Sequence, residues 1–129
     1  MQSMLGTWKL IEGYALDKSG NRLPSPFGPQ PMGVAEFGPE RMIGVTGDAR
    51  SSLPPEVNSR VLVAYSGPYS FDGSELVTKV DAASDPALIG TEQRRRIKVI
   101  DTVRLLISPT NEVLASQPGS LEFVWERVG

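Results

Sequence analysis

The sequence contains neither cysteine nor histidine, and each absence excludes a class of chemistry. Without cysteine the chain can form no disulfide, no thiolate nucleophile and no sulfur-ligated metal site. Without histidine it lacks the commonest metal ligand and the usual general base near neutral pH. Serine–histidine and cysteine–histidine hydrolysis are therefore excluded, and any proton transfer must rely on acidic residues, tyrosine, lysine or arginine.

The chain also lacks an excess of positive charge, a membrane-spanning stretch and a cofactor motif. Its 13 Lys and Arg residues face 15 Asp and Glu residues, and the net charge of −2 gives no attraction for nucleic acid or an anionic membrane. No signal-peptide pattern begins the sequence, and no stretch reaches the roughly 18 apolar residues of a membrane span. The acidic residues are scattered and the glycines fit no phosphate loop. We therefore expect no metal, no cofactor, no membrane or nucleic-acid partner, and a cytoplasmic location.

Proline and glycine punctuate the chain at short intervals, which predicts many short strands and no long helix. The 129 residues suit one domain over 1–129. The spacing predicts eight strands, at residues 5–16, 33–37, 41–46, 60–71, 74–82, 91–100, 103–108 and 121–128. Because proline cannot donate a hydrogen bond to a neighbouring strand, the proline-rich segment 17–31 is expected to lie outside any sheet and to border the open end of the fold. A polar loop is predicted over 109–120.

Eight antiparallel strands of this length close naturally into an all-β, up-and-down barrel, which leaves no exposed edge and can hold one small ligand. An immunoglobulin-like sandwich is the competing fold, because it has short alternating strands with turns at similar spacing. The strand count alone does not separate the two folds. The residues at the two ends of the chain favour the barrel.

Each end of the chain carries a tryptophan motif, with Gly6 and Trp8 near the start and Trp125 and Arg127 near the finish. Together these residues resemble the signature of the calycins, which have glycine and tryptophan on the first strand and arginine on the last. The resemblance implies that Arg127 packs across the Trp8 indole at the closed end of the barrel, a contact that suits a planar guanidinium and an aromatic face. The ends are also similar to those of fatty-acid-binding proteins, but segment 17–31 has no counterpart of their helix pair.

Further motifs, in the same order along the chain, resemble those of the small bacterial and fungal lipocalin-like domain proteins. They are Pro31-Met32-Gly33, the run at 64–69, Asp85-Pro86, the run at 90–96 and Trp125-Glu126-Arg127. The resemblance spans nearly the whole chain and implies a lipocalin-like barrel that encloses a small ligand, in a family without a single established activity. Family members often carry histidine in the strand after the Asp-Gly turn, where this chain has Thr78 and Lys79. No role of that histidine carries over.

Strand parity predicts which side chains face the interior, because alternate residues of a strand point to opposite sides. In the strand at 91–100, Glu92 and Arg94 are expected to face water, whereas Gln93 and Arg95 face inward. Two alternatives for Arg95 are a solvated charge run and a position at the rim, where carbonyl groups satisfy it. The same parity turns further side chains inward, namely Phe37, Met42, Tyr65, Tyr69, Thr78 and Phe123. Buried tyrosines are more often packing residues than catalysts.

On the first strand, Glu12 and Tyr14 share a face with Trp8 and Leu10, which would bring a carboxylate toward the interior. An unpaired buried carboxylate is costly, so Glu12 would need a proton or a partner, for which Arg95 is the candidate. The alternative is that a twist or bulge turns Glu12 outward.

These residues favour a barrel that binds a small, largely apolar organic molecule with a polar handle. The alternative is a cofactor-independent isomerase or cyclase of specialised metabolism, of polyketide or terpenoid type, that acts in the same cavity. A third possibility is a structural barrel whose interior is filled by side chains. The candidate catalytic residues are Arg95, Tyr65, Tyr69 and Glu12. The candidate ligand-binding residues are Tyr14, Phe37, Met42, Tyr65, Tyr69, Thr78, Gln93, Arg95 and Phe123.

Overall fold

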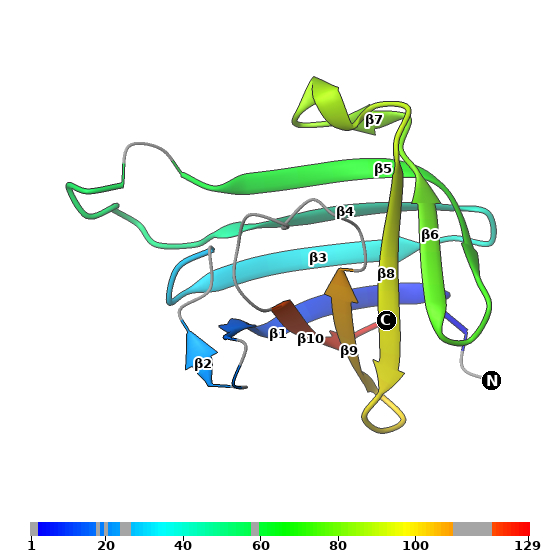
Figure 1. Cartoon of the computed structure of the whole chain (residues 1–129). Coiled ribbons are helices and arrows are strands. Elements are labelled where there is room, and N and C mark those ends of the chain that lie inside the picture. Colours follow the sequence, from blue (N-terminus) through cyan, green and yellow to red (C-terminus); the bar gives the residue numbers. More distant parts are fainter. Residues whose placement is uncertain (1–2, 18, 20, 24–26, 58–59, 110–119) are drawn as a thin grey trace.

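The structure is a computed structural model that describes residues 3–17, 19, 21–23, 27–57, 60–109 and 120–129 of the chain. Within these residues it contains ten strands and one short 3-10 helix, η1 (Pro86–Leu88) (Figure 1). The strands are β1 (Gly6–Leu16), β2 (Arg22–Leu23), β3 (Pro31–Phe37), β4 (Arg41–Asp48), β5 (Leu62–Phe71), β6 (Glu75–Lys79), β7 (Ala82–Ala83), β8 (Glu92–Val99), β9 (Arg104–Pro109) and β10 (Ser120–Arg127). None of the helical residues described forms a helix long and apolar enough to cross a membrane.

Eight of the described strands pair side by side in an antiparallel ring, in the order β1, β3, β4, β5, β6, β8, β9 and β10. The ring closes where β1 pairs with β10, with Trp8 opposite Arg127 and Leu10 opposite Trp125. The predicted eight-stranded, antiparallel, up-and-down barrel is therefore confirmed. A two-sheet sandwich is excluded, because hydrogen-bonded pairing runs around the whole ring. β2 and β7 lie outside the ring, paired with β1 and β5.

The alternation of side chains along β8 shows why this highly charged sequence forms part of the wall. Gln93 and Ile97 are buried, whereas Arg94 on the opposite face is exposed. The Arg94 guanidinium lies 2.9 Å from a Glu75 carboxylate oxygen and 2.8 Å from one of Glu92, on the outer surface. Parity along this strand is uninterrupted, so its inward and outward faces are those predicted.

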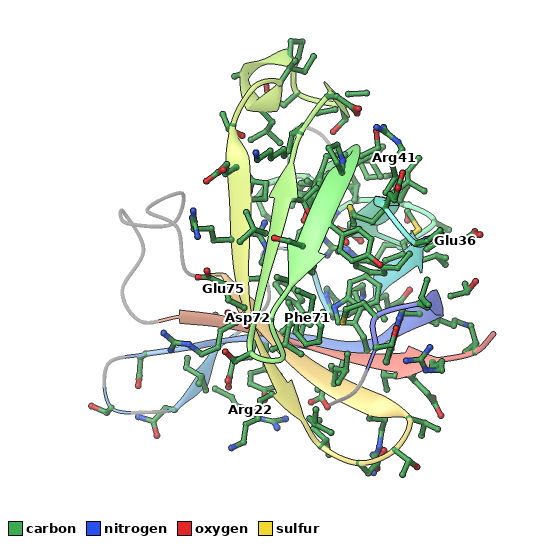
Figure 2. All side chains as sticks on the ribbon, turned by 90° about the vertical axis from the view of Figure 1, so that its right-hand side faces the viewer. Arg22, Glu36, Arg41, Phe71, Asp72 and Glu75 are labelled. Atoms are coloured by element: carbon green, nitrogen blue, oxygen red, sulfur yellow. The ribbon has the colours of Figure 1, made fainter. Side chains whose placement is uncertain are left out.

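The turn between β5 and β6 forms around a single carboxylate. Asp72 accepts hydrogen bonds from the backbone N–H groups of Glu75 (2.7 Å) and Ser74 (2.9 Å), and these bonds hold the pKa of its carboxyl below the usual range. Gly73 has a φ of 104°, in the left-handed region that favours glycine. Figure 2 shows Asp72 at the tip of this hairpin, near Phe71 and Glu75. The Asp-Gly turn predicted from the sequence is confirmed.

Successive connections alternate between the two ends of the barrel, because neighbouring strands of the ring are antiparallel. The end at which β1 begins is closed by the N-terminal residues. There the Arg127 guanidinium lies 4.3 Å from the centroid of the Trp8 ring, and the indole N–H donates to the Met4 carbonyl at 2.9 Å. Arg127 also donates to the carbonyls of Ser3 (2.6 Å) and Leu5. The predicted contact between Trp8 and Arg127 is confirmed.

The proline-rich segment departs from expectation at both of its ends. Its residues Arg22–Leu23 form β2 and pair with the end of β1, before the first proline is reached. Pro31 begins β3, opposite Asp48. The expectation that all of 17–31 lies outside the sheet is therefore wrong, because a proline is tolerated as the first residue of a strand. Residues 24–26 lie outside the described residues, as do residues 110–119 of the second predicted loop.

Candidate functional site

The barrel encloses a cavity of about 380 Å³, to which every strand of the ring contributes. Its volume falls within the range of about 300 to 1,000 Å³ that is typical of small-molecule sites. Further lining side chains come from connections at the open end. A purely structural barrel with a filled interior is therefore not what the chain forms.

Small residues on β3 and β4 make room for this cavity. Ala35 and Gly44 lie opposite each other in the β3–β4 register, and both line the cavity. A Cβ atom on Gly44 would have the Met42 Cε and the Ala35 Cβ as its nearest neighbours, at 3.5 and 3.6 Å. These are ordinary van der Waals distances, so a single carbon atom would fit in front of Gly44 without a clash, whereas a larger side chain would extend into the cavity that Gly44 lines. The cavity depends on the absence of a side chain at this position.

Aromatic and other apolar side chains make up most of the wall. Toward the closed end the wall consists of buried side chains, namely Trp8, Phe37, Met42 and Trp125. Toward the open end, Phe27 meets Phe123 edge to face, with ring centroids 5.6 Å apart and an interplanar angle of 65°. The structure thus places the predicted residues Phe37, Met42 and Phe123 on the cavity.

Polar side chains on β8 and β5 interrupt the apolar wall. Arg95, Gln93 and Tyr65 all line the cavity, as strand parity predicts. One Nη2 hydrogen of Arg95 is donated to the Gln93 Oε1 at 3.0 Å, and the Gln93 Nε2 donates in turn to the Thr91 hydroxyl at 3.1 Å. Gln93 is only 4% exposed, so this chain of hydrogen bonds satisfies a buried amide. No group of acidic side chains among the described residues could hold a metal ion.

Tyr69 and Thr78 face inward but are not among the side chains that line the cavity. The Tyr69 hydroxyl donates to the Gly38 carbonyl at 2.6 Å, and its ring meets Phe37 edge to face at 5.0 Å. Burial raises the pKa of this hydroxyl. Thr78 is 1% exposed and lies in the wall opposite Gln93. The expected position of both residues at the cavity is therefore wrong, and the structure gives them packing roles.

A β-bulge in β1 moves Glu12 and Tyr14 to the outside of the barrel. Leu10 pairs with Trp125, but Glu12 pairs with Val124, so the parity of the strand shifts between them. The Glu12 carboxylate lies 2.7 Å from the Arg22 guanidinium, which also sits 4.0 Å from the centroid of the Tyr14 ring. The inward position expected for these two side chains is wrong, and Glu12 is not the partner of the cavity arginine. Of the two alternatives for Glu12, the bulge is what the chain adopts.

A buried ion pair between Asp48 and Arg50 lies at the open end of the barrel. Asp48 is 2% exposed, and its carboxylate lies 2.6 Å from the Arg50 guanidinium. Arg60 donates to the backbone carbonyls of both residues, at 2.7 and 2.6 Å. Gly28 packs so closely against the pair that a Cβ atom there would lie 2.8 Å from the Asp48 Oδ2. The proline-rich segment that carries Phe27 therefore borders the open end, as predicted.

Replacing Asp48 with asparagine should destabilise the barrel at neutral pH and matter less in acid. Hydrogen bonds from the Arg50 side chain hold the pKa of the Asp48 carboxyl below its ordinary value of 3.8. A lowered folded-state pKa stabilises the protein above the unfolded-state pKa, and this contribution is lost as the pH falls through the folded-state pKa. Urea unfolding should thus show a midpoint difference between wild type and variant that narrows below pH 3.8. A difference of constant size would contradict a charged pair at this site.

Sequence reasoning missed the residues that reach the cavity from loops. Phe27, Ser84, Asp85 and Leu88 line it from connections at the open end. Strand parity carries no information about them, because a loop has no two-residue period. One signal was available for Phe27. It is the single aromatic residue of segment 17–31, and a large apolar side chain in a proline-rich segment indicates burial.

Comparisons with known proteins identify the family of the chain. Among solved structures, a redesigned β-barrel is similar to the chain with a TM-score of 0.49 and 11% identity, over 98% of this chain and 92% of that one. No curated protein matches the sequence. A family model described as a lipocalin-like domain matches residues 57–128, which include β5 to β10 and more than half of the 129 residues. The chain therefore belongs to the family of lipocalin-like domains.

Proposed function

We propose that this barrel binds a small, largely apolar organic molecule that carries one polar group. The observation that supports this most strongly is the cavity of about 380 Å³, which has a largely apolar wall and a few polar side chains, among them Arg95 and Gln93. An apolar molecule gains free energy when it leaves water for such a wall, by about 25 cal/mol for each Å² buried. A few fixed polar groups then orient it. Lipocalin-like membership is consistent with this general role.

The alternative of a cofactor-independent isomerase or cyclase has fewer residues to draw on than the sequence suggested. Glu12 pairs with Arg22 on the outer surface, and the Tyr69 hydroxyl donates to the Gly38 carbonyl. Tyr65 and Arg95 are the two candidate catalytic residues that line the cavity. We therefore propose binding as the function. Whether the barrel also converts its ligand can be assayed once that ligand has been identified.

Filling the cavity should abolish binding without unfolding the barrel. Phenylnaphthylamine, a neutral apolar dye whose fluorescence rises in apolar surroundings, is the probe. Gly44→Phe places a benzyl group in the cavity that Gly44 lines, and we expect the dye to bind at least about tenfold more weakly. The measurement is a fluorescence titration, with circular dichroism and urea unfolding to show that the variant is folded.

The matched control is Val45→Phe, on the next residue of the same strand. Val45 is 39% exposed on the outer surface, so the same ring is added there without entering the cavity. This variant should bind the dye as the wild type does. If the dye fails to bind wild type, or binds Gly44→Phe equally well, the proposed function is wrong. If the dye binds as expected, native mass spectrometry of freshly purified protein can identify a natural molecule that the cavity retains. The same measurement on Gly44→Phe serves as the comparison.

A further inference from the structure

We infer that the polar group of the ligand is a carboxylate or another singly charged anion, bound by the Arg95 guanidinium inside the cavity. The inference rests on the proposed function and gives its ligand a chemical class: an amphipathic organic acid with an apolar body. Three features of the described residues support it, namely the unused donors of Arg95, the balance of charge around the cavity and the hydrogen bonds that orient the guanidinium.

Arg95 has guanidinium N–H groups that make no hydrogen bond within the described part of the chain. A guanidinium carries five N–H groups and remains cationic in proteins. Arg95 donates to the Arg94 carbonyl at 2.9 Å and to the Gln93 Oε1 at 3.0 Å, and both acceptors are uncharged. No carboxylate of the described chain lies within ion-pair distance of it. A half-buried cation with free donors and no counter-ion is a ready site for an anion, which can accept two parallel hydrogen bonds from it.

The nearby acidic side chains are engaged elsewhere. Glu75 and Glu92 pair with Arg94 on the outer face of the wall. Asp48 pairs with Arg50 at the open end. These three carboxylates therefore have their own cations. Asp85, which also lines the cavity, instead caps η1 and accepts a hydrogen bond from the Ala87 N–H at 3.0 Å. Arg95 differs from Arg94 in facing the cavity.

The charge around the cavity favours a singly charged anion over a phosphate. Arg95 is the one cationic side chain among the described residues that line the cavity, and the Asp85 carboxylate lines it as well. A doubly charged phosphate would leave one negative charge uncompensated by Arg95 in a largely apolar space that Asp85 also lines, which is costly. A carboxylate is neutralised by Arg95 alone.

The guanidinium is oriented in advance by a series of hydrogen bonds. Gln93 receives one from Arg95 and donates to the Thr91 hydroxyl, which donates to the Leu88 carbonyl at 2.6 Å. The series ends on η1, whose residue Leu88 also lines the cavity. A guanidinium held in this way loses less side-chain entropy when an anion binds, and this raises affinity. Tyr65 also lines the cavity and carries a hydroxyl group that can donate a hydrogen bond.

The test compares naphthoate with naphthamide, which have the same apolar body and nearly the same shape but differ in charge. Their affinities are measured directly by calorimetry near neutral pH, independently of any dye. Wild type should bind the acid at least about tenfold more tightly than the amide, because hydrogen bonds to a charged group are stronger than those to a neutral one. In Arg95→Met this preference should disappear while the amide still binds, and binding of the amide shows that the variant is folded.

The control is Arg96→Met, which removes the same charge from an exposed position on the opposite face of β8. It should keep the full preference for the acid. Equal affinities in wild type, or a preference that persists in Arg95→Met, would overturn the inference while leaving dye binding and the proposed function intact. If neither naphthoate nor naphthamide nor the dye binds wild type, both proposals fall together.

Discussion

Replacing Gly67 with alanine should lower the free energy of unfolding of the barrel by about 3 kcal/mol or more. A Cβ atom at Gly67 would lie 1.8 Å from the Lys79 carbonyl oxygen and 2.8 Å from its carbon. Both neighbours are backbone atoms, which cannot rotate away as a flexible side chain can. For a small domain with a total stability of about 5 to 15 kcal/mol, such a loss is large.

The close approach at Gly67 has a cause in the topology. β5 changes partner at this point: Tyr69 pairs with Thr78 of β6, whereas Ser66 pairs with Ala82 of β7. The pairing is irregular here, because the three steps from Tyr69 to Ser66 correspond to four steps from Thr78 to Ala82. The Asp81 N–H donates to the Ser66 carbonyl at 2.9 Å, and the Lys79 backbone lies against Gly67, where no side chain would fit.

Urea unfolding followed by tryptophan fluorescence measures the effect, and Gly44→Ala is the matched control. Gly44 is also an inward-facing strand glycine, but its nearest neighbour would lie 3.5 Å from an added Cβ. Alanine there should change stability by no more than about 1 kcal/mol, because it relieves the entropic cost of glycine in a strand. Equal midpoints for Gly67→Ala and Gly44→Ala would contradict the steric argument.

Strand parity predicted the interior well wherever a strand runs without interruption. Gln93 and Arg95 on β8, and Tyr65 on β5, line the cavity as their positions along the sequence indicate. Parity failed on β1, where the bulge between Leu10 and Glu12 reverses the two faces. No residue in this part of the sequence marks the bulge. It is a property of the pairing between β1 and β10, which lie at opposite ends of the chain.

Parity also gives the side of a residue but not its depth. Tyr65 and Tyr69 face inward on the same strand, yet only Tyr65 is among the residues that line the cavity. Tyr69 lies near the closed end, where its hydroxyl reaches the Gly38 carbonyl of the β3–β4 turn. That contact depends on the register between β4 and β5, which local sequence does not specify. The sequence thus predicts which side chains of a regular strand point inward. Which of these side chains line the cavity depends on the register between strands in the closed ring.

The two ends of the barrel are built differently, and we expect substitutions at each end to have different effects. At the closed end, the Trp8 side chain is buried and its polar atom is satisfied by Met4. At the open end, Phe27 reaches the cavity from the connection between β2 and β3, and Leu88 reaches it from η1. Changes near Arg95 are therefore expected to affect the ligand, and changes at Trp8 to affect the fold.

Trp8→Ala should consequently lower the free energy of unfolding by about 3 to 5 kcal/mol, the usual cost of removing a buried aromatic side chain. The Trp8 side chain is 1% exposed, donates to the Met4 carbonyl at 2.9 Å and stacks with Arg127. Truncation leaves a cavity at the closed end, frees a buried carbonyl and removes the surface on which the guanidinium packs.

Urea unfolding followed by circular dichroism measures this effect, because the substitution itself alters tryptophan fluorescence. Lys9→Ala is the control on the same strand: Lys9 is exposed, and its truncation should change stability by no more than about 0.5 kcal/mol. Trp8→Phe retains an aromatic face for Arg127 but lacks the indole N–H, so its stability should fall between wild type and Trp8→Ala. If Trp8→Ala unfolds at the same urea concentration as Lys9→Ala, the closed end is not held together by the contact between Trp8 and Arg127.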